Sequence, residues 1–378
     1  MSVVSVLPVR SRRERRIFLT FPWRIFKNDP LWVPPLLPDL AERIDPRRGV
    51  FFQRGQAEFF IAWRDGLAVG TICAAEDRQT NAEVGGRECI FGFFHFIEDY
   101  AVMEALLACA GRWATARGLD TLTGPFNLDY EDGYGILVEG RDRPPTLMCG
   151  HTPPYYLDLV ERYGFQPARG DNIAFAFDLQ AGSSALLELE RMAGRVRARR
   201  SYTIRPADLA HWEDELEKIY VLLNLALRHL PDYRPWPREV VFNSLAPFRK
   251  IADAELVLFA EDGGRTVGWL PGLPDLNEVF IHVDGLRYPW DYLKLAWHMR
   301  RRVECLAVKS VLVLPEYWGG GAAILLFDEL ARRARQRGYR WIDLSLTSDD
   351  NPRTPALARR FGAKLYKRYR VYRGKVHP

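Results

Sequence analysis

The sequence predicts an α/β protein of two tandem domains, each a mixed β-sheet with helices on its faces. Its 378 residues are too many for one ordinary domain. The two halves repeat the same order of strand-like and helix-like segments at a shared spacing. Strand patterns alternate with helix patterns in each half, and this alternation is typical of sheets covered by helices.

The composition is that of a globular protein, with 48% apolar and 27% charged residues. The net charge of +5 predicts only a weak preference for anionic ligands. Five cysteines and seven histidines are dispersed without metal-ligand spacing, so we predict no metal site. No segment approaches the roughly 18 apolar residues that span a membrane. We therefore expect a soluble cytoplasmic protein that has no membrane partner.

The internal repeat is defined by its glycines. Each half contains a predicted hairpin with a Val-Gly pair, and the two glycines, Gly70 and Gly268, lie 198 residues apart. Each half then has an amphipathic helix that ends in Arg-Gly and runs into a short apolar strand. Each copy closes with an aromatic-Gly pair, and its glycines, Gly164 and Gly362, are again 198 residues apart. The equal spacing at both ends predicts a duplicated domain.

The copies are predicted to be joined by a basic helix. We assign residues 1–180 to an N-terminal domain, residues 181–200 to the connecting helix and residues 201–378 to a C-terminal domain. The arginines of the connector are interpreted as a solvated face, because no aromatic residues alternate with them as in a nucleic-acid interface. We therefore predict no nucleic-acid partner.

The segment with the clearest chemistry is residues 305–336. Residues 305–314 are almost continuously apolar, as in a strand buried on both faces. Three glycines at 319–321 follow, and a helix is predicted from about residue 322 to 336. A glycine turn at a helix N-terminus offers free amides and the positive end of the helix dipole to a pyrophosphate. A flexible loop is the alternative, but strand, turn and helix in one register favour an anion cradle. The segment lacks the spacing of nucleotide-hydrolysing and dinucleotide-binding loops.

Residues 313–323 (VLPEYWGGGAA) resemble the acyl-CoA motif of the GNAT (N-acetyltransferase) superfamily, V-x-P-x-x-[QR]-x-x-G-x-[GA]. Residues 351–362 resemble the later N-x(6)-Y-x(3)-G-F segment, and residues 21–35, 124–127 and 153–156 resemble a bacterial group of tandem GNAT proteins. The resemblance implies two tandem GNAT-like domains, with acetyl-CoA or another acyl-CoA as cosubstrate in the C-terminal one. The cofactor-binding residues that it implies are Val313, Gly319, Gly320, Gly321, Ala322, Ala323 and Asn351.

Some positions depart from the GNAT pattern. Trp318 replaces the motif's Gln or Arg, and the tyrosine that protonates the departing thiolate in many members would fall at Ala358. The catalytic candidates are therefore Asp275 and Asn277, which share one side of an extended segment, and Tyr366, a replacement acid on the last strands. A polar loop that caps its own turn and an amphipathic edge strand are the alternative explanations.

The N-terminal copy is predicted to have lost the CoA site. Glu98 and Asp99 precede its helix, and two carboxylates there repel a pyrophosphate. Its polar and aromatic loops are predicted to bind the substrate, with a structural Ω-loop as the alternative. The substrate-binding candidates are Asn127, Glu131, Tyr134 and Tyr156. The Phe/Trp/Pro-rich segment 21–35 is predicted to be an arm covering the core rather than a membrane anchor.

The sequence thus predicts an N-acyltransferase that moves an acetyl or other acyl group from acyl-CoA to the amine of a small molecule or peptide. A catalytically degenerate GNAT-fold binding protein is the alternative, and an aminoacyl or long-acyl transferase ranks third. A monomer and a homodimer are both compatible with the sequence, which leaves the acceptor and the acyl chain length open.

Overall fold

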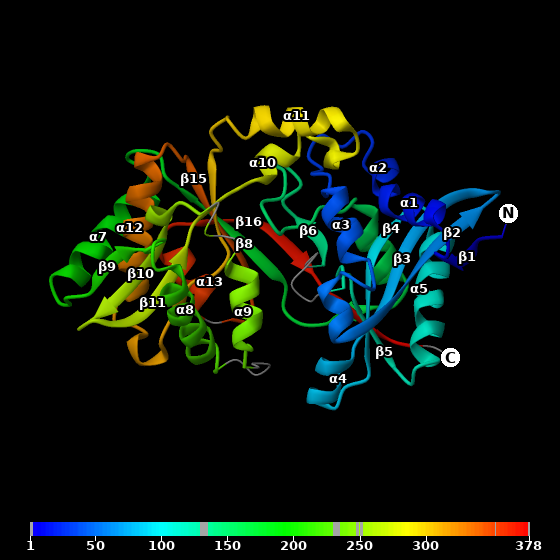
Figure 1. Cartoon of the computed structure of the whole chain (residues 1–378), viewed down its shortest axis with the longest axis horizontal. Coiled ribbons are helices and arrows are strands. Elements are labelled where there is room, and N and C mark those ends of the chain that lie inside the picture. The colour runs from blue at the N-terminus through cyan, green and yellow to red at the C-terminus, as the bar shows by residue number, and fades with distance from the viewer. Residues whose placement is uncertain are drawn as a thin grey trace.

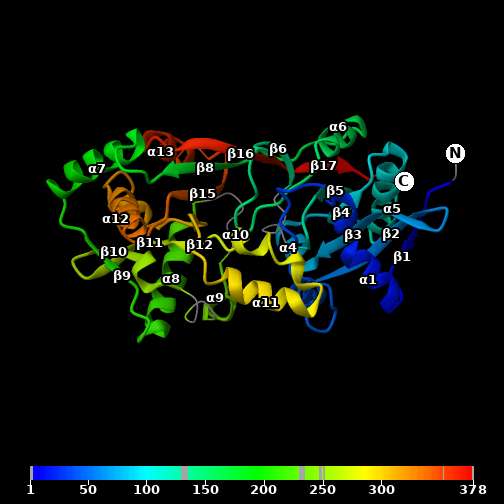
Figure 2. The ribbon, with the colours of Figure 1, turned by 90° about the horizontal axis from the view of Figure 1, so that it is seen from above.

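The computed structural model describes residues 3–128, 135–229, 235–246, 249, 252–351 and 353–376. The molecule is elongated, with one sheet system at each end and long strands running between them (Figures 1 and 2). Helices pack on all three sheets, and the two larger sheets contain both parallel and antiparallel strand pairs. The predicted α/β class with mixed sheets is confirmed.

The N-terminal sheet has the strand order β1-β2-β3-β4-β5-β17-β7. Helix α5 (Tyr100–Thr115) packs on it through a continuous apolar face that includes Met103, Leu106 and Leu107. Asp99 caps this helix by accepting the amides of Ala101 and Val102, so a carboxylate occupies its N-terminus. The strands are β1 (Ser5–Pro8), β2 (Gly55–Arg64), β3 (Leu67–Asp77), β4 (Glu88–Phe96), β5 (Thr121–Gly124), β7 (Gln166–Pro167) and β17 (Tyr372–Lys375).

The C-terminal half has two sheets, of orders β14-β11-β10-β9 and β12-β13-β15-β8-β16-β6. Helix α12 (Ala322–Gln336) lies between the first of these sheets and helix α7 (Ser184–Arg197), with Leu326 and Leu330 in the core. The bounds of α12 are those predicted. The strands are β6 (Ile136–Glu139), β8 (Asn172–Asp178), β9 (Thr203–Pro206), β10 (Val257–Asp262), β11 (Arg265–Pro271), β12 (Leu273–Pro274), β13 (Cys305–Val308), β14 (Leu312–Val313), β15 (Trp341–Ser348) and β16 (Lys364–Arg370).

Strands from each half of the chain join the sheet of the other half. Strand β8 pairs with both β15 and β16, and β6 pairs with β16. In the reverse direction, the final strand β17 pairs with β5 and β7. In Figure 1 the long strands β8 and β16 run across the middle of the molecule. Sheet pairing therefore crosses the predicted connector at residues 181–200, and the domain boundaries stay a prediction.

Smaller helices cover the rest of the surface. The aromatic arm at residues 21–35 buries Phe21 and Phe26, and Phe26 stacks on Trp32 with ring centroids 4.9 Å apart. Trp23 in the same arm donates through Nε1 to Asp284 at 2.6 Å. The arm thus covers the core, as predicted. The remaining α-helices are α1 (Arg12–Thr20), α2 (Pro22–Ile25), α3 (Leu37–Arg43), α4 (Arg78–Val84), α6 (Tyr155–Arg162), α8 (Trp212–Ala226), α9 (Arg238–Leu245), α10 (Asn277–Phe280), α11 (Pro289–His298) and α13 (Thr354–Arg360).

None of the helices in the described part of the chain is both long enough and apolar enough to cross a bilayer.

Candidate active site

The two C-terminal sheets separate at a fork. Strands β13 and β15 pair in parallel from Cys305 opposite Trp341 to Val308 opposite Leu344. Beyond Val308 the chain leaves this sheet, and β14 pairs instead with β11 of the other sheet. The predicted continuous strand at 305–314 is therefore two strands, because residues 309–311 between them belong to neither sheet. Within the described residues β14 has β11 as its one strand partner, so its other edge faces the fork.

The glycine turn leads from this fork into helix α12. Gly319 and Gly321 have φ values of 77° and 96°, in the left-handed region that favours glycine. No side chain caps the N-terminus of α12. Among the described residues the amides of Gly319, Gly321, Ala322 and Ala323 have no hydrogen-bond partner, whereas the amide of Gly320 donates to the Tyr317 carbonyl at 3.0 Å. The donors that an anionic ligand requires are therefore present at the start of this helix.

Helix α7 and a tyrosine cover one side of the turn. A side chain on Gly321 would begin 2.6 Å from Val196 of α7, and one on Gly320 would begin 2.6 Å from the Tyr202 hydroxyl. Any ligand of these amides must therefore approach from the other side, along the fork.

Trp318 lies at the motif position that departs from the family pattern. Its Nε1 donates to the carbonyl of Val313 at 2.9 Å, and the Arg353 guanidinium lies 4.0 Å from its ring centroid. The carbonyl of Val313, a predicted cofactor contact, is thus already bonded within the protein. Asn351, predicted to bind the cofactor too, accepts the amides of Arg353 and Thr354 through Oδ1 and so holds the start of α13.

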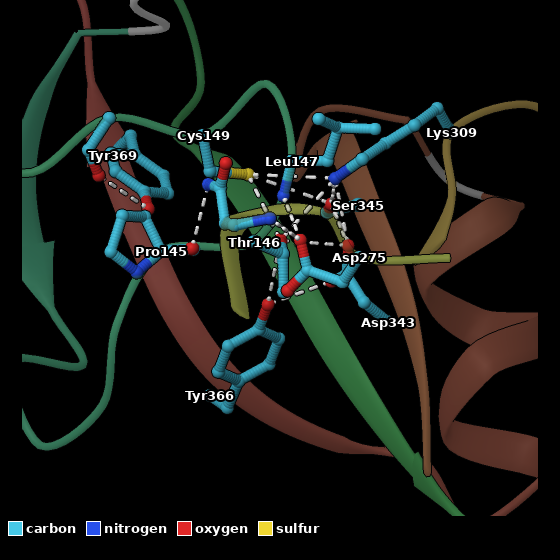
Figure 3. A network of polar contacts seen from close by, with 12 residues as sticks. Pro145, Thr146, Leu147, Cys149, Asp275, Lys309, Asp343, Ser345, Tyr366 and Tyr369 are labelled. Atoms are coloured by element: carbon cyan, nitrogen blue, oxygen red, sulfur yellow. Dashed lines mark hydrogen bonds and ion pairs between the residues drawn. The ribbon is translucent and has the colours of Figure 1, made fainter. Parts of the chain in front are cut away.

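A buried polar network lies where β13 ends (Figure 3). At its centre is the carboxylate of Asp343, which has no exposed surface. Its Oδ2 accepts from Lys309 Nζ at 2.8 Å, from Thr146 Oγ1 at 2.9 Å and from Ser345 Oγ at 2.5 Å. Its Oδ1 accepts from the Tyr366 hydroxyl at 2.7 Å. A buried carboxylate needs such charge-assisted partners to offset its desolvation.

The charge state of Lys309 follows from this network. Burial alone would lower its pKa, but the Asp343 carboxylate at 2.8 Å outweighs burial and raises it, so an ammonium stands at the fork at neutral pH. The same Nζ donates to Ser345 Oγ at 2.6 Å and lies 3.8 Å from the sulfur of Cys149. Burial, followed by the negative charge of Asp343, raises the pKa of Tyr366, which therefore keeps its proton.

A second carboxyl group, that of Asp275, lies beside the network and is 3% exposed. Its Oδ1 accepts the amides of Leu147 at 2.8 Å and Asn277 at 3.2 Å. Burial raises the pKa of Asp275 to about 7. A carboxyl group with this pKa can take up and release a proton at neutral pH, as a general base must.

The three predicted catalytic residues thus come together around residues 145–147. Asn277 donates through Nδ2 to the Pro145 carbonyl at 2.9 Å, and the Tyr366 hydroxyl lies 3.3 Å from Thr146 Oγ1. Asp275 and Asn277 open onto a pocket of about 400 Å³. Its lining residues are Asp142, Arg143, Pro144, Pro145, Thr146, Asp275, Asn277, Glu278, Ile281 and Trp341.

The predicted substrate residues lie elsewhere. Asn127 accepts the amide of Phe93 at 2.8 Å, and the buried Tyr156 accepts the amide of Phe96 at 3.0 Å, so both hydrogen-bond to strand β4. Neither lines the 400 Å³ pocket. Tyr156, at 1% exposure, has a core position that leaves its ring no surface for a ligand. Glu131 and Tyr134 lie outside the described residues.

Three residues of the network, Lys309, Asp343 and Thr146, were not predicted from the sequence. The two charged residues had a detectable signal: Lys309 is the one charged side chain of the predicted strand at 305–314, and Asp343 lies in the middle of the predicted apolar strand at 339–346. Thr146 had none, since its partner Asp343 is 197 residues away in sequence. Among the described residues no group of three or more His, Cys, Asp or Glu side chains is placed to hold a metal ion.

Comparisons with known proteins agree with this architecture. The model of the acetyltransferase (GNAT) family matches residues 216–363, which include the fork, the glycine turn and α12. A relative named bacterial ceramide synthase, from Caulobacter vibrioides, is 28% identical over 376 residues, which are 98% of this chain and 97% of the relative. Protein YghO of Escherichia coli is 25% identical over 97% of this chain and 94% of its own length.

Among solved structures, a tandem GNAT protein from the clavulanic acid biosynthesis pathway superposes with a TM-score of 0.57. The match covers 99% of both chains at 12% identity, so it shows the fold alone. Together with the family match over the C-terminal half, it confirms the predicted resemblance. Residues 216–363 match the GNAT acetyltransferase family, and the whole chain has the fold of a tandem GNAT protein.

Proposed function

We propose that this protein transfers an acyl group from acyl-CoA to a primary amine at the fork between β14 and β15. The observation that carries the proposal is the uncapped N-terminus of α12, which follows the fork directly in the chain. Its free amides and the helix dipole suit the pyrophosphate of CoA. The open edge of β14 offers the acyl chain or pantetheine arm a path toward Lys309 and Asp275.

The chemistry requires a neutral amine and a stabilised leaving group. In the proposed step, the carboxylate of Asp275 takes a proton from the incoming ammonium. The amine nitrogen then forms a bond with the thioester carbonyl carbon, the carbon–sulfur bond breaks, and the proton lost by the acylated nitrogen passes to the departing thiolate to give the free thiol. The ammonium of Lys309 would stabilise the negative charge on the thioester oxygen and the sulfur. Asp343 and Tyr366 would act as positioning residues that hold Lys309.

For the acceptor, we propose the amine of a long-chain amino alcohol, with a long-chain acyl-CoA as donor. Support comes from the relative named bacterial ceramide synthase, because its similarity spans 98% of this chain and because a ceramide is an N-acylated long-chain amino alcohol. The pocket beside Asp275 also has apolar walls, from Pro144, Pro145, Ile281 and Trp341.

Thiol release from acyl-CoA tests the activity. Purified protein is incubated with acetyl-CoA or palmitoyl-CoA and with either sphinganine or a short amine such as ethanolamine. We expect turnover with palmitoyl-CoA and sphinganine, and its loss in Asp275→Asn. If the short amine is the better acceptor, the acceptor proposal is wrong while the acyltransferase proposal stands. If no pair turns over, the catalytic proposal fails.

Ala323→Asp tests the CoA site separately. A carboxylate in the first turn of α12 interacts favourably with the helix dipole but repels a pyrophosphate, so the variant is expected to fold and to lose CoA binding. The matched control is Ala323→Ser, which adds a polar group without charge and is expected to bind CoA. Isothermal titration with CoA measures both. Equal affinity in the two variants would show that CoA does not use these amides.

A catalytically degenerate binding protein is the second candidate. It is favoured by Trp318, whose Nε1 already bonds the Val313 carbonyl on the strand edge, and by the Gly320 amide, which is bonded to Tyr317. CoA binding without turnover for any donor and acceptor pair would support this candidate. Turnover that is lost in Asp275→Asn would reject it.

A further inference from the structure

Helix α11 buries two polar side chains. Asp291, with no exposed surface, accepts the amide of Tyr288 at 3.0 Å and the Lys294 ammonium at 2.8 Å. His298, the last residue of α11, is 9% exposed and stacks on His282 with ring centroids 4.3 Å apart. In a typical surface helix the apolar face is the buried one. In α11, by contrast, polar side chains are buried and apolar ones are exposed.

The outward side of α11 is apolar and aromatic. Trp290, Leu293 and Trp297 are 54%, 74% and 56% exposed, and their spacing of three and four residues aligns them in one stripe. Tyr292 and Met299 are each 51% exposed at the borders of the stripe. Scattered exposed apolar residues are ordinary, but a continuous stripe of this kind marks an interaction site.

Cationic side chains surround this stripe. From residue 287 to 302 the chain carries five Arg or Lys residues and one acid, the buried Asp291. Arg300 and Arg301 directly follow the helix, and the Arg301 guanidinium lies 4.6 Å from the Trp297 ring centroid. At the other end of α11 lies a pocket of about 470 Å³ whose lining includes Arg12 and Arg16 of α1. In Figure 2, α11 and α1 both lie along the lower border of the molecule.

We propose that α11 docks this protein on an anionic lipid surface. Tryptophan rings prefer the boundary between lipid headgroups and acyl chains, and arginines bind the headgroup phosphates. A second copy of the chain is the other apolar occupant to consider. A two-fold dimer through α11 would bring the same basic rims together, and the repulsion of like charges disfavours it.

Docking would serve the proposed function, since a long-chain amino alcohol or acyl-CoA partitions into a bilayer. The proposal itself rests on the surface of α11 and not on catalysis. The expectation that the protein has no membrane partner rested on the lack of spanning segments and on the arm at residues 21–35. A helix that lies in the plane of the surface has a different pattern.

Vesicle flotation of the full chain tests the proposal. The wild-type protein is expected to bind phosphatidylcholine vesicles that contain phosphatidylglycerol at least tenfold more strongly than pure phosphatidylcholine vesicles, and to be released by high salt. The variant Trp290→Ser/Leu293→Ser/Trp297→Ser is expected to lose at least tenfold of the binding. The matched control is Val221→Ser/Leu225→Ser on α8, where the side chains are 45% and 38% exposed, and it should bind as the wild type does.

Three outcomes would overturn the proposal. The first is that the wild type does not bind anionic vesicles, and the second is that the α11 variant binds them as strongly as the wild type does. The third is that the wild type is a dimer in vesicle-free solution and that, of the two variants, only the α11 variant is a monomer. Light scattering detects the last of these. Because flotation requires neither acyl-CoA nor turnover, its result does not depend on the proposed activity. Conversely, turnover of a water-soluble amine, if the wild type has it, should persist in the α11 variant.

Discussion

Replacing Asp275 by Asn tests the electrostatic state of the candidate base while it keeps the hydrogen bonds of the side chain. Oδ1 of Asp275 accepts the amides of Leu147 and Asn277 at 2.8 and 3.2 Å. The amide oxygen of asparagine can accept both of them. The substitution therefore removes a titrating charge and leaves the local geometry in place.

The sign of the stability effect follows from the pKa of Asp275. Burial is the largest cause that raises this pKa from 3.8 to about 7. An acid with a higher pKa in the folded chain than in the unfolded chain contributes most to stability below the unfolded value. This contribution is lost as the pH rises through the folded value. A shift of about three pKa units corresponds to roughly 4 kcal/mol.

The Asn variant has no such loss. Its free energy of unfolding, relative to the wild type, is therefore expected to rise by up to roughly 4 kcal/mol between about pH 4 and pH 8. Over the same range the wild-type acyl-transfer rate should increase through about pH 7, since the base must be ionised, and the variant should show no transfer.

Urea unfolding at about pH 5 and pH 8, followed by tryptophan fluorescence, measures the stability difference. Asp99→Asn serves as the control, because the hydrogen bond from Arg64 lowers the pKa of the Asp99 carboxyl and both pH values lie above its titration. Its effect should therefore be equal at the two pH values. If the Asp275→Asn difference is also equal at both, or is smaller at pH 8, the argument from burial is refuted.

Three further substitutions have defined outcomes. Lys309→Met leaves the buried Asp343 without its cation and is expected to lower the free energy of unfolding by roughly 3 to 5 kcal/mol. Thermal melting should show this loss, and the double variant that also carries Asp343→Asn should regain much of the stability. Gly92→Ala is expected to prevent soluble expression, because its Cβ would lie 1.4 Å from a backbone oxygen, whereas Gly111→Ala, with its nearest neighbour at 3.5 Å, should express normally. Trp318→Phe removes the hydrogen bond to the Val313 carbonyl and so frees this acceptor at the fork. Titration should then show CoA binding about fivefold more tightly, the equivalent of one hydrogen bond of about 1 kcal/mol. An unchanged affinity would show that CoA does not use the Val313 carbonyl.

Much of the fold could be predicted because it depends on local patterns. The helix at 322–336 has an apolar face of its own and a glycine turn before it, so its bounds could be read directly. The repeated glycines indicated the duplication. The exchange of strands β8 and β17 could not be predicted, because the pairing of a short apolar strand depends on distant partners and its own residues do not specify them.

The candidate site was predictable to the extent that its residues lie near recognisable turns. Asp275 and Asn277 were found through their period-two spacing after a strand. Lys309 and Asp343 were missed because their predicted strands were recognised by apolar character alone, and the charged side chain inside each strand was not considered. A charge inside a buried strand is costly unless a partner compensates it, so two such strands in one chain predict an ion pair.

The arrangement also explains how the N-terminal half, which is predicted to lack a CoA cradle, contributes to the candidate site. Asp99 blocks the equivalent helix end there, yet the loop after β6 supplies Thr146 to Asp343 and the Leu147 amide to Asp275. Asp343 and Asp275 of the C-terminal half therefore each accept a hydrogen bond from the N-terminal half. Against the effect of burial, the hydrogen bond from the Leu147 amide lowers the pKa of Asp275, so the N-terminal half affects the titration of the candidate base. In the proposed mechanism the two copies therefore form one active unit, in which the C-terminal copy would bind the acyl donor and the N-terminal copy supplies hydrogen bonds to the two carboxyl groups.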